Sequence, residues 1–87
     1  MIVVLDRVTE RHPYLSKADV RMAWRYAVVC LPRDNGRPFE YIALGFDVRG
    51  RPIEMLGRRI GDDHWAIWHA FTPPTRKALR EMGLEGR

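Results

Sequence analysis

Histidine, arginine and lysine are close together in the second half of the chain, and these residue types can act on a phosphodiester. His69 is followed within eight positions by Arg76 and Lys77, and Arg58 and Arg59 close the apolar segment before it. An imidazole with a pKa of about 6.5 can move a proton at neutral pH, and guanidinium groups match phosphate through paired hydrogen bonds. We therefore predict one phosphate-binding surface around His69.

RNA is the phosphodiester that needs the least machinery, because its own 2′-hydroxyl is the nucleophile. In this hypothesis His69 is the general acid or base, and Arg59 with Arg76 or Lys77 holds and stabilises the phosphate. The alternative for His69 is a hydrogen bond that fixes the corner between a strand and a helix. The predicted RNA contacts are cationic, aromatic or imidazole side chains: Lys77, Arg58, Arg80, Trp65, Tyr41 and His12.

Other catalytic motifs are missing from the sequence. The three histidines are far apart and no cysteine or carboxylate cluster accompanies them, so we predict no metal site. The glycine spacing does not match a phosphate-binding loop, and we expect no cofactor. The lone Cys30 is interpreted as a small core residue.

Composition indicates one domain, residues 1–87, with ordinary globular character: 46% hydrophobic and 30% charged residues. The net charge is +4, and arginine supplies 13 of the 15 cations. Such a chain suits a nucleic acid or an acidic protein as partner, although the arginines can also be plain surface residues. A single cysteine favours a reducing compartment, and the apolar runs are too short to span a bilayer. We expect a cytoplasmic protein with no membrane contact.

The stretch from residue 39 to 71 predicts a three-stranded antiparallel meander, with turns at 47–50 and 61–63. In its third strand, alternation predicts that Trp65, Ile67 and His69 share one face. Residues 2–5 form a β-branched run that predicts an edge strand. The sheet is therefore expected to hold the meander and this N-terminal strand.

Helices are predicted on either side of the meander. A short one follows Asp6, and a long one begins at a Ser16 cap and runs to Leu31, since apolar residues recur there at helical spacing until Pro32. A last helix starts at a Thr72 cap and ends at Gly83. The predicted fold class is α+β, with the small sheet packed against one long helix in the N-terminal half and one C-terminal helix.

Several segments of the chain carry a resemblance to a known family. Residues 11–20, Arg-His-Pro-Tyr-Leu-Ser-Lys-Ala-Asp-Val, resemble the basic-His-Gly-Ile/Val-Ser-x-x-Glu-Ala segment of BrnT-type toxins, which belong to the RelE-like ribonuclease group. The following order is similar as well: a helix, a strand with Ile-Ala-Leu-Gly at 42–45, a Gly-Arg hairpin at 50–51, a third strand, and Thr-Arg-Lys at 75–77. The chain departs from the family pattern in having His-Ala-Phe at 69–71, where Ser-Ala-Arg is usual, and Pro-Tyr at 13–14 in place of one glycine.

The resemblance implies a RelE/BrnT-like fold and the toxin of a bacterial toxin–antitoxin system, acting as an endoribonuclease on free or ribosome-bound mRNA. It also implies a small antitoxin with an acidic binding segment as partner, and operator DNA bound only through the antitoxin complex. The main alternative is a non-catalytic module that binds nucleic acid or protein through the same arginine-rich face. A purely structural subunit is a third interpretation.

Overall fold

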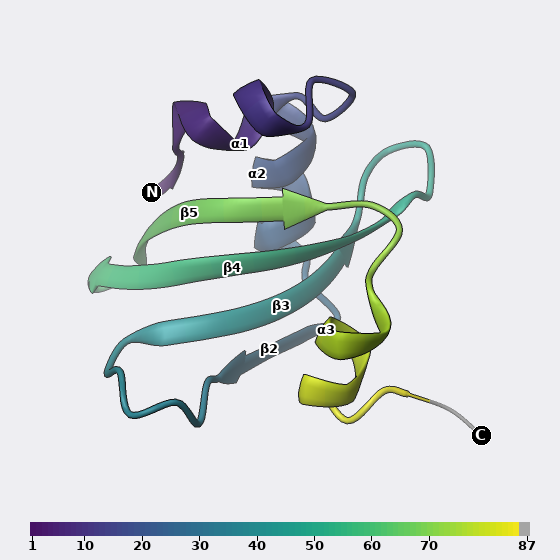
Figure 1. Cartoon of the computed structure of the whole chain (residues 1–87). Coiled ribbons are helices and arrows are strands. Elements are labelled where there is room, and N and C mark those ends of the chain that lie inside the picture. The colour runs from purple at the N-terminus through teal and green to yellow at the C-terminus, as the bar shows by residue number, and fades with distance from the viewer. Residues whose placement is uncertain (86–87) are drawn as a thin grey trace.

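A five-stranded mixed sheet is the centre of the computed structural model, which describes residues 1–85. The strand order is β1-β5-β4-β3-β2, with β1 parallel to β5 and the other neighbours antiparallel (Figure 1). The strands are β1 (Ile2–Val4), β2 (Val29–Pro32), β3 (Glu40–Phe46), β4 (Pro52–Gly61) and β5 (His64–Phe71). The helices are α1 (Asp6–Arg11), α2 (Lys17–Arg25) and α3 (Arg76–Glu81).

The two faces of the sheet are covered differently. Helix α2 packs on one face through Val20, Ala23 and Trp24, against a core that includes Ile53 and Ile67. Helix α3 covers only part of the other face, where Ala78 and Met82 meet residues of β3. In Figure 1, α2 lies behind the sheet, α1 along the β5 edge and α3 in front of the lower strands. The rest of the front surface, called the open face below, has no helix over it.

The predicted α+β class and the meander are confirmed, but the predicted long helix is wrong. The capping box at Ser16 forms with Asp19, yet α2 ends at Arg25 and residues 29–32 form β2 on the edge of the sheet. The apolar spacing in this segment fits a helix as well as a strand. Val29 pairs with Leu44 of β3, and this pairing decides in favour of the strand. With β2 the sheet has five strands, and the parallel pairing of β1 with β5 makes it mixed rather than antiparallel.

Close contact between α2 and the sheet depends on glycine. A Cβ atom added at Gly45 of β3 would lie 2.0 Å from the Ala23 carbonyl oxygen in α2. At Gly57 of β4 it would lie 2.8 Å from the Trp24 ring. Neither site can hold a side chain at the observed spacing, so these glycines let the helix lie directly on the strands.

A β-bulge in β5 changes which residues share a face. Leu56 of β4 pairs with His69, but Gly57 pairs with Ile67, so Trp68 is an extra residue with no partner opposite. The bulge places Ile67 in the core under α2 and turns both Trp68 and His69 to the open face. The prediction that Ile67 and His69 share a face is therefore wrong.

The C-terminal helix begins later than expected. Its cap is Thr75, whose hydroxyl accepts from the Ala78 amide, whereas the Thr72 hydroxyl donates to the Pro52 carbonyl. The predicted stop at Gly83 is confirmed by a φ of 72° at that residue. Cys30, expected in the core, is exposed on β2. None of the three helices in the described chain is long and apolar enough to cross a membrane.

Candidate functional site

A histidine–carboxylate pair is the centre of the open face. His69 Nε2 lies 2.8 Å from Glu54 Oε2, across the β4–β5 pair. The other carboxylate oxygen, Oε1, accepts from the Thr75 amide at 2.6 Å. Glu54 is buried, with 7% of its surface exposed, whereas the His69 side chain is 30% exposed. The carboxylate thus joins β4, β5 and the start of α3, and leaves the imidazole reachable from outside.

The protonation of this pair follows from its hydrogen bonds. Burial tends to raise the pKa of Glu54, but the hydrogen bonds from His69 and Thr75 outweigh burial and hold the pKa below its usual value. At neutral pH Glu54 is therefore ionised and can only accept. His69 must donate through Nε2–H, so in the neutral ring Nδ1 carries the lone pair. This is the arrangement in which a carboxylate orients a histidine base.

A second imidazole lies beside the first. The ring centroids of His12 and His69 are 6.4 Å apart, and His12 also contacts Phe71 edge-on at 4.9 Å. The Tyr14 hydroxyl lies 3.3 Å from His12 Nδ1. His12 terminates α1, where its amide donates to the Val8 carbonyl. Two histidines and a phenol therefore meet at the end of β5, although they are far apart in sequence.

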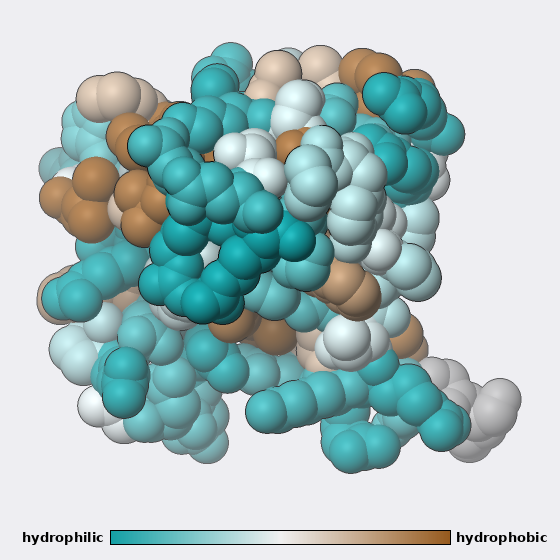
Figure 2. All heavy atoms as spheres, turned by 45° about the horizontal axis from the view of Figure 1, so that its top comes forward, coloured by the Kyte–Doolittle hydropathy of each residue, from teal (hydrophilic) through white to brown (hydrophobic). Residues whose placement is uncertain are grey.

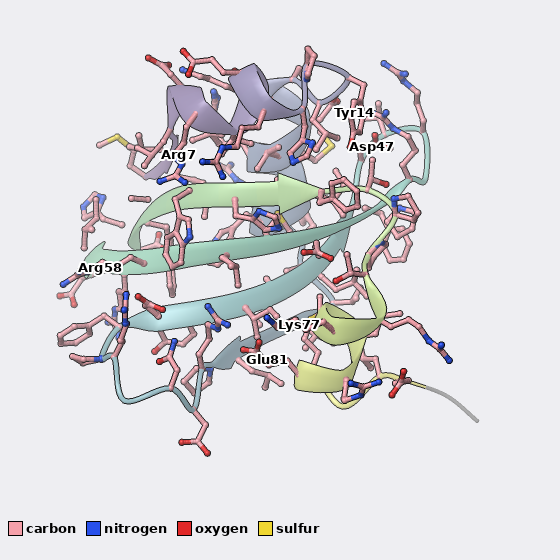
Figure 3. The ribbon with its side chains drawn as sticks, in the orientation of Figure 1. Arg7, Tyr14, Asp47, Arg58, Lys77 and Glu81 are labelled. Atoms are coloured by element: carbon pink, nitrogen blue, oxygen red, sulfur yellow. The ribbon has the colours of Figure 1, made fainter. Side chains whose placement is uncertain are left out.

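A buried ion pair holds the loop that carries Tyr14. Arg51 donates from Nη1 to the Tyr14 carbonyl at 3.2 Å and from Nε to Asp47 at 2.6 Å, and its Nη2 is 3.5 Å from Asp19 of α2. Figure 3 shows Asp47 and Tyr14 side by side, where the β3–β4 hairpin reaches the loop between α1 and α2. Although burial tends to raise the pKa of Asp47, hydrogen bonds from Arg51 and the Arg49 amide hold it below its usual value. The contacts of Arg51 with Asp47 and with the Tyr14 carbonyl therefore hold this loop beside the histidines.

A cavity of about 240 Å³ adjoins His69, and its lining carries charges of both signs, with Glu54 and Glu81 beside two cations. Lys77 of α3 and Arg33 at the end of β2 both line it. Arg33 is neutralised by Glu81, with Nε to Oε2 at 2.7 Å, whereas Lys77 has no ion pair with another residue of the described chain. Lys77, next to Glu81 in Figure 3, is therefore the cation available to a ligand at His69.

A larger cavity of about 630 Å³ lies next along the open face. It shares Arg33 with the first cavity, and Arg7 of α1, Arg58 of β4 and Trp68 of the bulge also line it. Figure 3 shows Arg7 extending from α1 toward β5, and Arg58 at the far end of β4. In Figure 2, seen from the α1 side, hydrophilic side chains cover most of the surface and the hydrophobic atoms form separate small groups.

Of the predicted site residues, His69 and Lys77 line one cavity and Arg58 lines the next. His12 does not line either cavity but lies beside His69, with the two ring centroids 6.4 Å apart. The structure does not bring Arg59 there. Alternation along β4 turns Arg59 to the α2 side, where it pairs in register with Trp65, and its guanidinium lies 3.4 Å from Asp62. The prediction that Arg59 converges with His69 is wrong.

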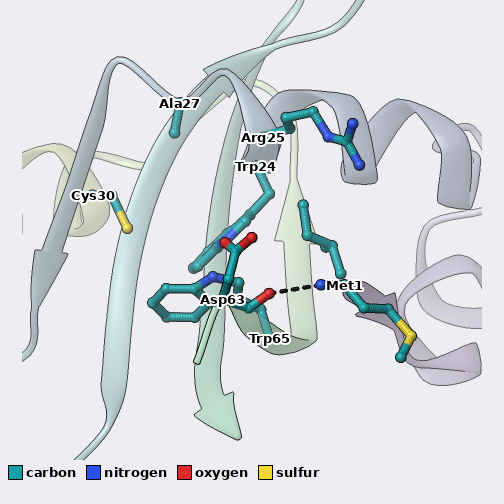
Figure 4. Close-up of a pocket in the computed structure, with 8 residues that line it drawn as sticks. Met1, Trp24, Arg25, Ala27, Cys30, Asp63 and Trp65 are labelled. Carbon is teal, nitrogen blue, oxygen red and sulfur yellow. Dashed lines mark hydrogen bonds between the residues drawn. The ribbon is translucent and has the colours of Figure 1, made fainter. Parts of the chain in front are cut away.

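The remaining predicted residues also lie elsewhere. Arg76 and Arg80 are exposed and pair with Glu85 at 3.5 and 2.9 Å, away from the His69 cavity. The Trp65 ring packs 4.9 Å from Tyr41 and 5.2 Å from Trp24 on the α2 side of the sheet. Figure 4 shows Trp65 in a different cavity of about 510 Å³, together with Trp24 and the Met1 ammonium group. Trp65 and Tyr41 are therefore half-buried and pack against the core on the face opposite His69.

Several open-face residues were not expected from the sequence: Glu54, Trp68, Arg7, Arg33 and Tyr14. One signal did point to Glu54, since an acidic residue inside an apolar strand must be paired when it is buried. Trp68 had no such signal, because its position depends on the bulge.

Metal ligands do not cluster in the part of the chain that the structure describes: no group of three or more His, Cys, Asp or Glu side chains there could hold a metal ion. No family model, curated protein or solved structure matches the chain.

Proposed function

We propose that this protein is an endoribonuclease that cleaves mRNA by attack of the 2′-hydroxyl on the adjacent phosphate. The observation that carries the proposal is the His69–Glu54 pair: His69 is reachable on the open face, Glu54 is buried beneath it, and a second histidine lies 6.4 Å away between ring centroids. This reaction requires an oriented base, a second proton carrier and a cation such as Lys77, which has no ion pair within residues 1–85.

The reaction assigns one proton to each histidine. His69 Nδ1 removes the proton of the 2′-hydroxyl, and the 2′-oxygen forms a bond to phosphorus. Lys77 neutralises the charge that builds on the phosphoryl oxygens. His12 is the general acid and donates a proton to the 5′-oxygen as the P–O5′ bond breaks. The products are a 2′,3′-cyclic phosphate and a 5′-hydroxyl end, and Glu54 stabilises the imidazolium that forms at His69.

The biological role that we propose is the toxin of a toxin–antitoxin system with a RelE/BrnT-like fold. Support comes from the resemblance of residues 11–20 and 42–45 to BrnT-type toxins, and from the order of two N-terminal helices followed by an antiparallel meander. The partner in this proposal is a small antitoxin with an acidic segment that covers the basic face. Operator DNA is bound only through that complex.

One observation favours a second candidate, a non-catalytic binding module. Glu54 also accepts from the Thr75 amide. The His69–Glu54 pair therefore also fits a purely structural role, in which it fixes the corner between β5 and α3. The open face would then bind nucleic acid or protein without cutting. The two candidates predict the same contacts but different chemistry.

The test is cleavage of end-labelled single-stranded RNA, with and without ribosomes, followed by analysis of the new ends. The proposal predicts 2′,3′-cyclic phosphate and 5′-hydroxyl ends, and no cut at a position that carries a single 2′-deoxy substitution. Controlled expression in a bacterium should arrest growth and create new RNA 5′ ends. Salt-sensitive RNA binding with no cleavage, on ribosomes or off them, would support the binding module instead.

A further inference from the structure

We infer that the larger open-face cavity is a stacking subsite for one nucleotide of single-stranded nucleic acid. Trp68 supplies the stacking surface, and Arg58 and Arg7 supply phosphate contacts. The inference extends the proposed function, because this cavity shares Arg33 with the cavity at His69, and a strand that reaches His69 would continue into it.

Trp68 is held in a position that suits stacking. The bulge turns its side chain to the open face next to His69, where it stays partly exposed instead of entering the core. The cavity that it lines, about 630 Å³, falls within the range of 300–1,000 Å³ that is typical of small-molecule sites. Every base has a π-face, and an aromatic platform in a cationic groove is the usual means of holding single strands.

The arginines of this cavity divide into two kinds. Arg33 and Arg37 lie 3.7 and 3.8 Å from the buried carboxylate of Glu40, so their charge is partly neutralised. Arg7 and Arg58 are exposed and form no ion pair with another residue of the described chain. Guanidinium groups without carboxylate partners are suited to phosphate oxygens. Arg7 and Arg58 are therefore the expected phosphate contacts on either side of Trp68.

The polar side chains that could read a base edge are already engaged. Asn35 donates from Nδ2 to Glu40 Oε1 at 3.0 Å, and its Oδ1 accepts from the Arg37 amide at 3.0 Å. Glu40 also faces the two arginines that neutralise it. These two bonds fix the direction of the Asn35 amide, and turning it toward one particular base edge would break them. The subsite should therefore accept any base, and specificity for RNA would come only from the 2′-hydroxyl in the reaction.

The test measures binding of 2′-O-methyl hexanucleotides of A, C and U, which lack the nucleophile and so cannot be cleaved. In Trp68→Ala we expect the dissociation constant to rise about 5- to 150-fold, by a similar factor for all three sequences. Trp68→Phe, which keeps a ring, should retain most of the affinity. Tyr26→Ala is the matched control, since Tyr26 is 70% exposed at the end of α2 and should change nothing.

A second pair of variants tests the phosphate contact without touching the ring. Arg58→Gln should lower the slope of log affinity against log salt by about 0.7, the value for one phosphate contact on a single strand. Arg49→Gln removes the same charge from the β3–β4 hairpin and should leave the slope unchanged. Both positions are exposed, so these variants are expected to fold even if Trp68→Ala does not.

The outcomes separate this inference from the nuclease proposal. If folded Trp68→Ala binds within twofold of the wild type, or if Arg58→Gln leaves the salt slope unchanged, the subsite is wrong whether or not RNA is cleaved. A preference of more than about tenfold for one base would overturn the sequence-tolerant assignment. If binding depends on Trp68 and Arg58 but no RNA is ever cut, the subsite stands and the nuclease proposal fails.

Discussion

Glu54→Gln is the substitution that best separates a catalytic pair from a structural one. The amide oxygen of glutamine can still accept from the Thr75 amide, which keeps the corner between β4 and α3. The amide NH₂ then faces His69 Nε2, 2.8 Å from the carboxylate oxygen that it replaces. To accept from it, the imidazole must move its proton to Nδ1, and the base proposed for the 2′-hydroxyl is lost.

The expected magnitudes follow from the bonds that change. A hydrogen bond to a charged group contributes about 1.5–3 kcal/mol and a neutral one about 0.5–1.5 kcal/mol, so the exchange should cost about 1–2 kcal/mol of stability. For a domain of this size that lowers the melting temperature by about 5–15 °C. Loss of the positioned base should lower the cleavage rate by about 10²–10⁴-fold.

The assay compares single-turnover cleavage of a labelled RNA with thermal unfolding, at a temperature where every variant is folded. Ser16→Ala is the control for stability: it removes the hydroxyl that accepts from the Asp19 amide at the N-cap of α2, on the opposite side of the sheet. That change should cost about 1 kcal/mol and leave the rate unchanged. If Glu54→Gln melts lower but cleaves at the wild-type rate, the pair is only a structural contact and our mechanism is wrong.

Three further predictions concern other parts of the molecule. Gly45→Ala should lower the free energy of unfolding by about 3 kcal/mol or more in urea titration, because the new Cβ would lie 2.0 Å from the Ala23 carbonyl oxygen; a loss below 1 kcal/mol would show that α2 shifts easily. Because the folded-state pKa of Asp47 is lowered, its stabilisation is present above the unfolded-state pKa of about 3.9 and is lost as pH falls through the folded value. Asp47→Asn should therefore flatten the acid side of the plot of melting temperature against pH, and an unaltered plot would contradict this. Arg76→Gln and Arg80→Gln should each cleave RNA within twofold of the wild-type rate, since both arginines pair with Glu85 away from His69; a tenfold loss in either would return that arginine to the site.

Three local signals predicted helix ends and a turn of this fold correctly. The Ser16 capping box, the hairpin at 47–50 and the Gly83 stop depend on a few neighbouring residues, and all three form as expected. The strand at 29–32 could not be recognised in the same way. Its apolar residues recur at a spacing that suits α2, and only the pairing of Val29 with Leu44 on a distant strand makes it a strand.

The candidate site was predicted only in part, because some of its residues come together through long-range pairing and not through local sequence patterns. His69 and Lys77 could be assigned to one site because they are close in the sequence, and they do line one cavity. The bulge at Trp68 shifts the alternation of β5 by one residue, which no local pattern announced. His12 meets His69 only because β1 and α1 run along the β5 edge, a long-range arrangement that spacing in the sequence does not contain.

The most direct test of the central claim is the single-turnover rate of RNA cleavage by His69→Ala, measured on protein whose unfolding transition shows that it is folded. We expect a rate about 10²–10⁴-fold below that of the wild type, with the wild-type products ending in 2′,3′-cyclic phosphate. A folded His69→Ala protein that cleaves at the wild-type rate would contradict the central claim.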